Sequence, residues 1–175
     1  PKFSPIPVEV EEGFWSCTPE ELLDNVSLSV YQTKTMAMPV YIYGPGYVLQ
    51  DKRHWVTLTA SEEGKLTEAV ITWCLDDDKE IRGGASNYSG TFLAVLANEE
   101  CDRIIWEINR LISQHEDGMA DELTRYSPKS RVYVSVGADS KRVITIVITP
   151  ITPGELANYR AEKEAQAAIQ AAREE

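Results

Sequence analysis

The chain has 175 residues, of which 43% are hydrophobic and 26% are charged, and this composition suits one globular domain with its own core. Its formal net charge is −11, so it lacks the basic surface that general nucleic-acid-binding proteins need, and we expect no direct nucleic-acid contact. No run of about 18 apolar residues occurs, which predicts that the chain does not cross a membrane. The first fifteen residues hold one lysine and no apolar core, so they are not typical of a secretory signal peptide.

The chain opens with an extended, proline-containing segment. Residues 18–21 (TPEE) then predict a helix start, because Thr18 suits the cap, proline suits the first helical position, and Glu21 suits the capping-box position. We expect this helix to be short and to end near Asn25. Residues 27–34 alternate in polarity and predict a strand. Residues 39–49 predict strand-like structure around a Gly-Pro-Gly bend.

Residues 54–60 and 66–75 predict a hairpin, with Gly64 at a left-handed turn position. The second strand is apolar on both faces, so we expect it to be interior to a sheet and covered on both sides. Residues 76–80 (DDDKE) would then turn into solvent, and Gly83 and Gly84 would lie in a mobile loop. Residues 88–97 are ambiguous between strand and helix, and we favour a strand.

Residues 98–115 give the clearest pattern, an amphipathic helix capped by Asn98, with one apolar stripe at three-four spacing. A short helix is possible over 119–126. Residues 131–136 and 141–149 predict a second hairpin, whose last strand should also be interior. A capping box formed by Thr152 and Glu155 opens a C-terminal helix over 153–173.

These elements predict an α+β fold, with a mainly antiparallel sheet of six or seven strands, a packed central helix at 98–115 and a C-terminal helix at 153–173. Residues 1–150 would form a single globular domain. Residues 151–175 would form a helix that docks at its start and then projects, or that meets a second copy in a homodimer.

The sequence offers little evidence for catalysis or for a cofactor. Cys17, Cys74 and Cys101 are far apart, odd in number and without metal-ligand spacing, so we expect buried, reduced thiols and a cytoplasmic protein without metal. Cys101 falls on the apolar stripe, and its acidic neighbours oppose thiolate formation. His54 and His115 are interpreted as surface or capping residues. The glycine pairs match no phosphate-binding motif.

Acidic blocks and aromatic residues are the most suggestive features for binding. The region 3–33 has six acids and no lysine or arginine, and the region 61–80 has seven acids against two lysines. Tyrosine and tryptophan are enriched in binding hot spots, although sheet packing also favours them. Aromatic residues are concentrated in one stretch: Tyr31, Tyr41, Tyr43, Tyr47 and Trp55. The candidate partner-binding residues are Asp76, Asp77, Asp78, Glu80, Tyr41, Tyr43, Tyr47 and Trp55.

Our leading hypothesis is therefore a non-enzymatic acidic protein that binds or inhibits a basic partner, such as a nuclease or a nucleic-acid-binding protein. Immunity, phage counter-defence or antirestriction proteins are settings in which such inhibitors work, because charge speeds the encounter. One alternative is a small enzyme whose Asp76-Asp77-Asp78 run, together with Glu80, holds Mg²⁺ or Mn²⁺. Adjacent aspartates in an extended segment point to opposite faces, so at most Asp76 and Asp78 would converge. Another is a structural or assembly subunit that pairs through its C-terminal helix.

Overall fold

The computed structural model describes residues 4–32, 40–43, 46–51, 54–74, 79–116, 118–119, 121–137 and 143–174. It confirms the α+β class. Four helices accompany two antiparallel sheets, and the larger sheet has seven strands in the order β3-β4-β5-β6-β9-β8-β7. The strands are β1 (Val10–Glu11), β2 (Phe14–Trp15), β3 (Val40–Tyr43), β4 (Gly46–Asp51), β5 (His54–Ala60), β6 (Leu66–Cys74), β7 (Asp121–Tyr126), β8 (Ser130–Val136) and β9 (Val143–Pro150). The helices are α1 (Pro19–Gln32), α2 (Lys79–Leu96), α3 (Cys101–Gln114) and α4 (Pro153–Glu174), and a 3₁₀ turn spans Asn98–Glu100.

The seven-stranded sheet joins two meanders. Strands β3 to β6 follow one another, the chain then crosses through α2 and α3 to β7 at the far edge, and β8 and β9 lead back to β6. The central strands β6 and β9 pair antiparallel, and Ile71 lies opposite Ile146. The expected hairpins and the interior positions of β6 and β9 are thereby confirmed, as is the left-handed Gly64 with φ of +85°.

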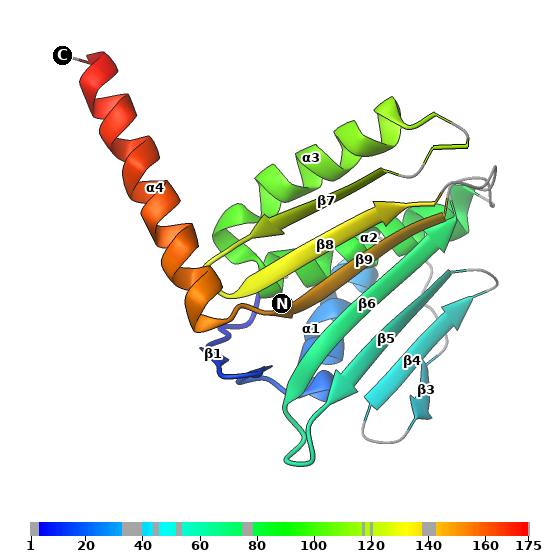
Figure 1. Cartoon of the computed structure of the whole chain (residues 1–175). Coiled ribbons are helices and arrows are strands. Elements are labelled where there is room, and N and C mark those ends of the chain that lie inside the picture. The colour runs from blue at the N-terminus through cyan, green and yellow to red at the C-terminus, as the bar shows by residue number, and fades with distance from the viewer. Residues whose placement is uncertain are drawn as a thin grey trace.

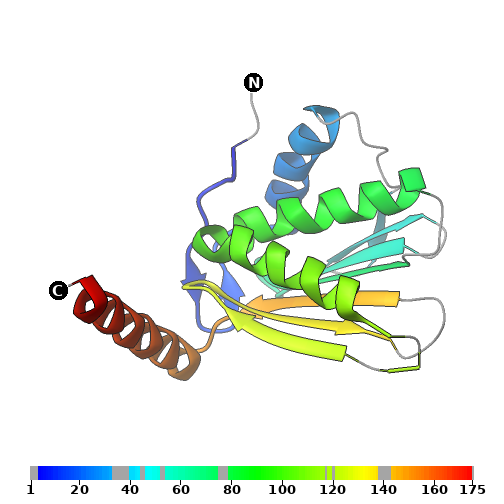
Figure 2. The ribbon, with the colours of Figure 1, turned by 90° about the horizontal axis from the view of Figure 1, so that it is seen from above.

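The core lies between one face of this sheet and the helices α1, α2 and α3, as Figure 2 shows. Alternation along β8 and β9 aims every second side chain at these helices, so that Val134 and Ile146, which are paired in register, are both buried. No described helix covers the other face of the sheet (Figure 1). There Thr145 and Val147 are only half-buried, so the expected cover on both faces is found on one face only, within the described residues.

Helix α1 corrects the expectation of a short helix followed by a strand over 27–34, because the helix continues to Gln32. The capping box is present as expected, since Thr18 N–H donates to Glu21 Oε1 and Glu21 N–H donates to Thr18 Oγ1, both at 3.1 Å. No proline or glycine follows within the helix, so elongation costs little once the first turn has formed. Asn25 is buried mid-helix, where its side-chain amide bonds Ile6 N–H and Ser4 O.

Helix α2 corrects both the loop expected at Gly83 and Gly84 and the strand expected over 88–97, since both lie in one helix. Tyr88, Phe92 and Leu96 are buried and recur every fourth residue, which is helical rather than strand periodicity. The apolar run over 88–97 is too short for its sequence to distinguish a helical period from a strand.

The third correction is β7, which replaces the short helix expected over 119–126. Leu123 pairs with Val134 of β8, so a neighbouring strand decides the conformation of this polar segment. The preceding helix α3 is confirmed, with Ile104 and Ile108 buried against the sheet. Asn98, however, is no cap: it has φ of +32°, lies in the 3₁₀ turn and makes no capping bond.

Candidate functional site

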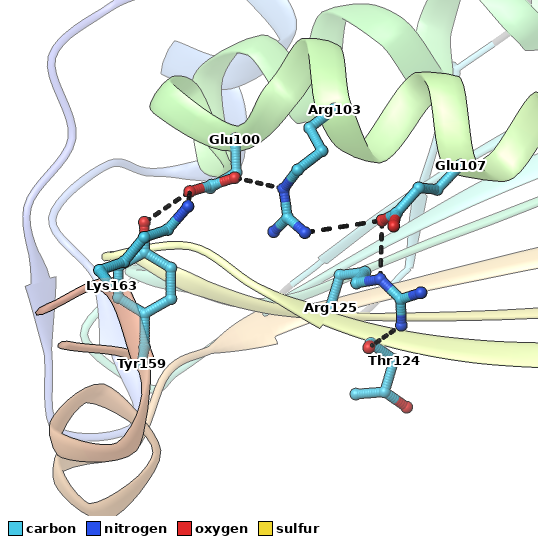
Figure 3. A network of polar contacts seen from close by, with 7 residues as sticks. All are labelled: Glu100, Arg103, Glu107, Thr124, Arg125, Tyr159 and Lys163. Atoms are coloured by element: carbon cyan, nitrogen blue, oxygen red, sulfur yellow. Dashed lines mark hydrogen bonds and ion pairs between the residues drawn. The ribbon is translucent and has the colours of Figure 1, made fainter. Parts of the chain in front are cut away.

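A polar cleft of about 400 Å³ lies between α3, β7 and α4. Three cationic side chains reach it from three different elements: Arg103 from α3, Arg125 from β7 and Lys163 from α4. The remaining lining residues are Glu107, Thr124, Tyr126, Tyr159, Glu162 and Gln166. Figure 3 shows the polar contacts among seven residues: Glu100, Arg103, Glu107, Thr124, Arg125, Tyr159 and Lys163.

Glu100 is the centre of these contacts. Its side chain is only 7% exposed, yet its carboxylate accepts hydrogen bonds from Arg103 Nε at 2.6 Å, Tyr159 Oη at 2.7 Å and Lys163 Nζ at 2.7 Å. Burial alone would raise the pKa of Glu100, but the hydrogen bonds from Lys163, Tyr159 and Arg103 lower it to about 2. Burial and the bond to Glu100 raise the pKa of Tyr159, so its hydroxyl stays protonated and donates. Glu100 is thus an ionised, buried acceptor.

These contacts hold α4 against the body of the molecule. None of the α4 residues is buried, and from residue 160 onward every described residue is exposed. Tyr159, Glu162, Lys163 and Gln166 line the cleft at helical spacing, so the helix turns a polar face toward the body. Its first turn is fixed by the expected capping box, in which Glu155 N–H donates to Thr152 Oγ1 at 3.2 Å and Thr152 N–H donates to Glu155 Oε1 at 3.0 Å. We call the contacts of Glu100 with Tyr159 and Lys163 the α4 latch.

A second concave surface lies at the start of α4, beside the small β1–β2 sheet. It encloses about 170 Å³ and is lined by Val10, Glu11, Glu12, Ile151, Pro153 and Leu156. Glu9, Glu11 and Glu12 are exposed, and no ion pair involves them among the described residues. We call this surface, together with Glu9, the acidic groove.

The β1–β2 sheet is firmly seated, so the acidic groove has a fixed wall. Trp15 is fully buried, and its indole N–H donates to Lys129 O at 3.1 Å. Leu66 N–H donates to Cys17 O, and Lys65 Nζ donates to Ser16 O. The turn between the two strands uses Gly13 with φ of +88°, a conformation that glycine adopts without strain.

Of the residues proposed from sequence for partner binding, those that the structure describes lie on other elements than the cleft and the groove. Tyr41 and Tyr43 lie on β3, Tyr47 on β4 and Trp55 on β5, which are adjacent strands at one edge of the sheet. Trp55 is 39% exposed. Glu80 lies in the first turn of α2, and Asp76, Asp77 and Asp78 lie outside the described residues.

The strand register relates these two groups of residues. It pairs Trp55 with Thr72, near the end of β6 from which the chain continues into the acidic run. This end of β6 is opposite to the end at Leu66, which bonds Cys17 beside the β1–β2 sheet. The acidic groove therefore lies near the Leu66 end of β6, and the last described residue of that strand, Cys74, is at the opposite end.

The three cysteines and His115 are all buried in the structure. Cys17, Cys74 and Cys101 are buried and unbonded to one another, as expected. Burial, and then Asp102, raise the pKa of Cys101 to about 11, which is unsuited to a nucleophile. His115 is the C-cap residue of α3, as one of the two interpretations expected, but it does not lie at the surface: its ring is fully buried and its Nδ1 lies 2.7 Å from Asp121 Oδ2. Asp121 is the first residue of β7, so the start of this strand lies beside the end of α3.

Among the described residues, no three His, Cys, Asp or Glu side chains gather in a way that would hold a metal ion. The acidic run lies outside those residues, so the hypothesis of an acidic metal site stays a prediction. None of the helices in the described part of the chain is long and apolar enough to cross a membrane.

Sequence reasoning missed the polar cleft and the acidic groove. Glu100, Arg103 and Glu107 do follow helical spacing, which signals a charged helix face. Nothing in the sequence links that face to Tyr159, which lies 59 residues further along the chain. Comparisons with protein-family models, with curated proteins and with solved structures found no match.

Proposed function

We propose that the protein is a non-enzymatic binding protein that engages a basic protein partner through the acidic groove. The observation that carries this proposal is the set of exposed carboxylates of Glu9, Glu11 and Glu12, which have no ion-pair partner in the described part of the chain. Uncompensated like charges raise the field around a protein and speed its encounter with an oppositely charged partner.

The groove supplies what carboxylates alone would lack. Val10, Ile151 and Leu156 line it with apolar surface. Hot spots are desolvated apolar contacts surrounded by polar groups, and a lysine or arginine side chain combines an apolar stem with a charged head. A basic segment of a partner would thus place its stems in the groove and its charges against the glutamates. Nucleases and other nucleic-acid-binding proteins carry such cationic segments, and blocking them would inhibit these partners.

The acidic run Asp76–Asp78 remains a second predicted contact, and it gives the test its matched control. Two triple variants each remove three negative charges: Glu9→Gln with Glu11→Gln and Glu12→Gln, and Asp76→Asn with Asp77→Asn and Asp78→Asn. Proteins captured from the source lysate at low salt, and then purified, would be titrated against each variant. Total charge is equal in the two variants, so a difference between them reports location.

The expected result is that the glutamate variant weakens binding by about tenfold or more, and that wild-type affinity falls as salt rises. A larger loss in the aspartate variant would show that the partner binds the acidic run and not the acidic groove. Capture that is independent of salt and unchanged in both variants would refute a charge-based partner.

A second candidate function is self-association through α4. At about 100° per residue, Ala161, Ala165, Ala168 and Ala172 lie on the side of α4 opposite to the latch residues Tyr159 and Lys163. The apolar stripe therefore faces away from the body, and every residue in it is exposed. A second copy would cover it, with small residues that permit close helix packing.

Light scattering tests this second candidate with two adjacent alanines. Ala168→Glu places a charge on the apolar stripe, whereas Ala167→Glu places the same charge beside it. A dimer that Ala168→Glu dissociates and Ala167→Glu retains would support pairing through α4. If the wild-type protein is monomeric at all concentrations measured, self-association through α4 is excluded.

A further inference from the structure

The ion pairs that line the polar cleft form an open chain with a cation at each end. Lys163 binds Glu100, Glu100 binds Arg103, Arg103 lies 3.8 Å from Glu107, and Glu107 accepts from Arg125 Nε at 2.7 Å. Three cations are thus shared by two carboxylates (Figure 3). In a chain whose net charge is −11, this network has an unbalanced positive charge.

Both arginines keep hydrogen-bond donors that their protein partners do not use. Arg125 donates a hydrogen bond from Nε to Glu107 and another from Nη1 to Thr124 O, and Arg103 donates one from Nε to Glu100. A guanidinium has five N–H donors in a planar fork. No acceptor among the described residues is hydrogen-bonded to Nη2 of either side chain. Their side chains are 44% and 36% exposed, so the spare donors are accessible from the cleft.

From this arrangement we infer a binding site for a small carboxylate monoanion in the polar cleft, held by Arg103 and Arg125 with Lys163 beside them. A guanidinium binds a carboxylate through paired N–H donors, which matches the unused donors here. Glu107 and Glu162 line the cleft and Glu100 adjoins it, so three carboxylates already accompany the three cations, and a ligand with one negative charge meets less repulsion than a ligand with two. The cleft is polar and of small-molecule size, which suits a short, hydrophilic ligand.

The same ligand would couple to α4. Lys163 and Gln166 come from α4, whereas Arg103 and Arg125 belong to α3 and β7. An anion that contacts both groups adds a bridge beside the α4 latch. Ligand that binds only the docked position of α4 stabilises that position, and the stabilisation grows with the logarithm of the ligand concentration once this exceeds Kd. The site is independent of the acidic groove, so either proposal stands if the other fails.

Nuclear magnetic resonance tests the site on the full chain, with acetate as the probe and chloride exchanged for it at constant ionic strength. We expect saturable shifts at the Arg103 and Arg125 Nε–H signals and at the backbone amides of residues 162–166. Hydrogen exchange across α4 should slow at saturating acetate. Inorganic phosphate, titrated in the same way, should bind more weakly than acetate.

Arg125→Gln should weaken acetate binding about tenfold, since it removes one guanidinium and leaves the Glu100 contacts in place. Arg131→Gln is the matched control, because Arg131 is similarly exposed at 37% and pairs with Glu155 outside the cleft. Shifts that stay linear in acetate, or equal binding in the Arg125 and Arg131 variants, would overturn the site. If phosphate binds more tightly than acetate, the proposal that the ligand carries a single negative charge is wrong. If Arg125→Gln does not fold, saturation at the wild-type arginine signals decides the question.

Discussion

Helices α3 and α4 are attached to the same body by opposite means. Helix α3 has 14 residues and buries Cys101, Ile104 and Ile108 against the sheet. Helix α4 has 22 residues, buries none of them and meets the body through its polar face. The difference shows that the length of a helix and its helix propensity do not decide how it packs against the rest of the molecule. Helix α3 is part of the core, whereas α4 is held by a few directed contacts that can be removed one at a time.

The largest effect should come from Ile104, which is fully buried on α3. Ile104→Ala should lower the free energy of unfolding by about 2–5 kcal/mol, because it removes apolar contacts and leaves a cavity. Ile169→Ala makes the same chemical change on α4, where the side chain is 54% exposed, and should change stability by less than about 0.5 kcal/mol. Urea unfolding followed by circular dichroism measures both. Equal losses in the two variants would contradict the comparison.

The next effect is on Glu100, which joins the two helices. Glu100→Gln should weaken α4 docking by about 1.5–3 kcal/mol, the range for hydrogen bonds to a charged group. Hydrogen exchange should speed up across α4 and remain slow across α3. Glu162→Gln is the control, since it removes an exposed carboxylate from the same region. Unchanged exchange in α4 of the Glu100 variant would show that other contacts hold the helix.

Acidification should reproduce that loss in the wild-type protein. The pKa of Glu100 is about 2 in the folded protein, below the value of about 4.3 for a glutamate in an unfolded chain. Its contribution is therefore complete above about pH 5 and is lost as the pH falls toward about 2. The stability difference between wild type and Glu100→Gln should shrink over this interval, as measured by thermal unfolding at a series of pH values. A constant difference would mean that the carboxylate is not ionised in the fold.

The smallest effect distinguishes two matched helix caps. Thr18 and Thr152 form the same capping box, but α1 buries Leu22 and Val26 while α4 buries nothing. Thr18→Ala should lower global stability by about 1 kcal/mol. Thr152→Ala should instead fray the start of α4 and leave the global unfolding transition nearly unchanged. Urea unfolding combined with exchange at residues 153–157 separates the two outcomes.

Local rules predicted much of the fold, and the failures share a cause. Both capping boxes, the stripe of α3 and the two hairpins follow from interactions between residues close in sequence. Helix α2 was missed because a run rich in small and apolar residues satisfies strand and helix patterns alike. Strand β7 was missed because its polar segment takes its conformation from β8. The extension of α1 to Gln32 was missed because the alternating polarity of residues 27–34 was given more weight than the helix that starts at the Thr18 capping box.

The candidate sites were less predictable than the fold. The sequence identified acidity and the absence of a catalytic motif, but its proposed contacts, Asp76–Asp78 and the aromatic residues, are not those that the polar cleft and the acidic groove contain. Glu11 and Leu156 line the same groove, and Glu100 accepts a hydrogen bond from Tyr159, only because the tertiary fold brings these distant segments together. Pairings of this kind across the chain leave no periodic signal.

The sequence alone determined the α+β class, the two capping boxes, the buried thiols and the charge of the protein, because each depends on composition or on neighbours along the chain. Tertiary structure decided which charges have partners. It buried Glu100 beneath α4, left Glu9, Glu11 and Glu12 without ion-pair partners in the described residues, and turned the apolar stripe of α4 away from the body. The physical reason is that the energy of a charge depends on its burial and on its partners, and both are set by contacts between distant segments.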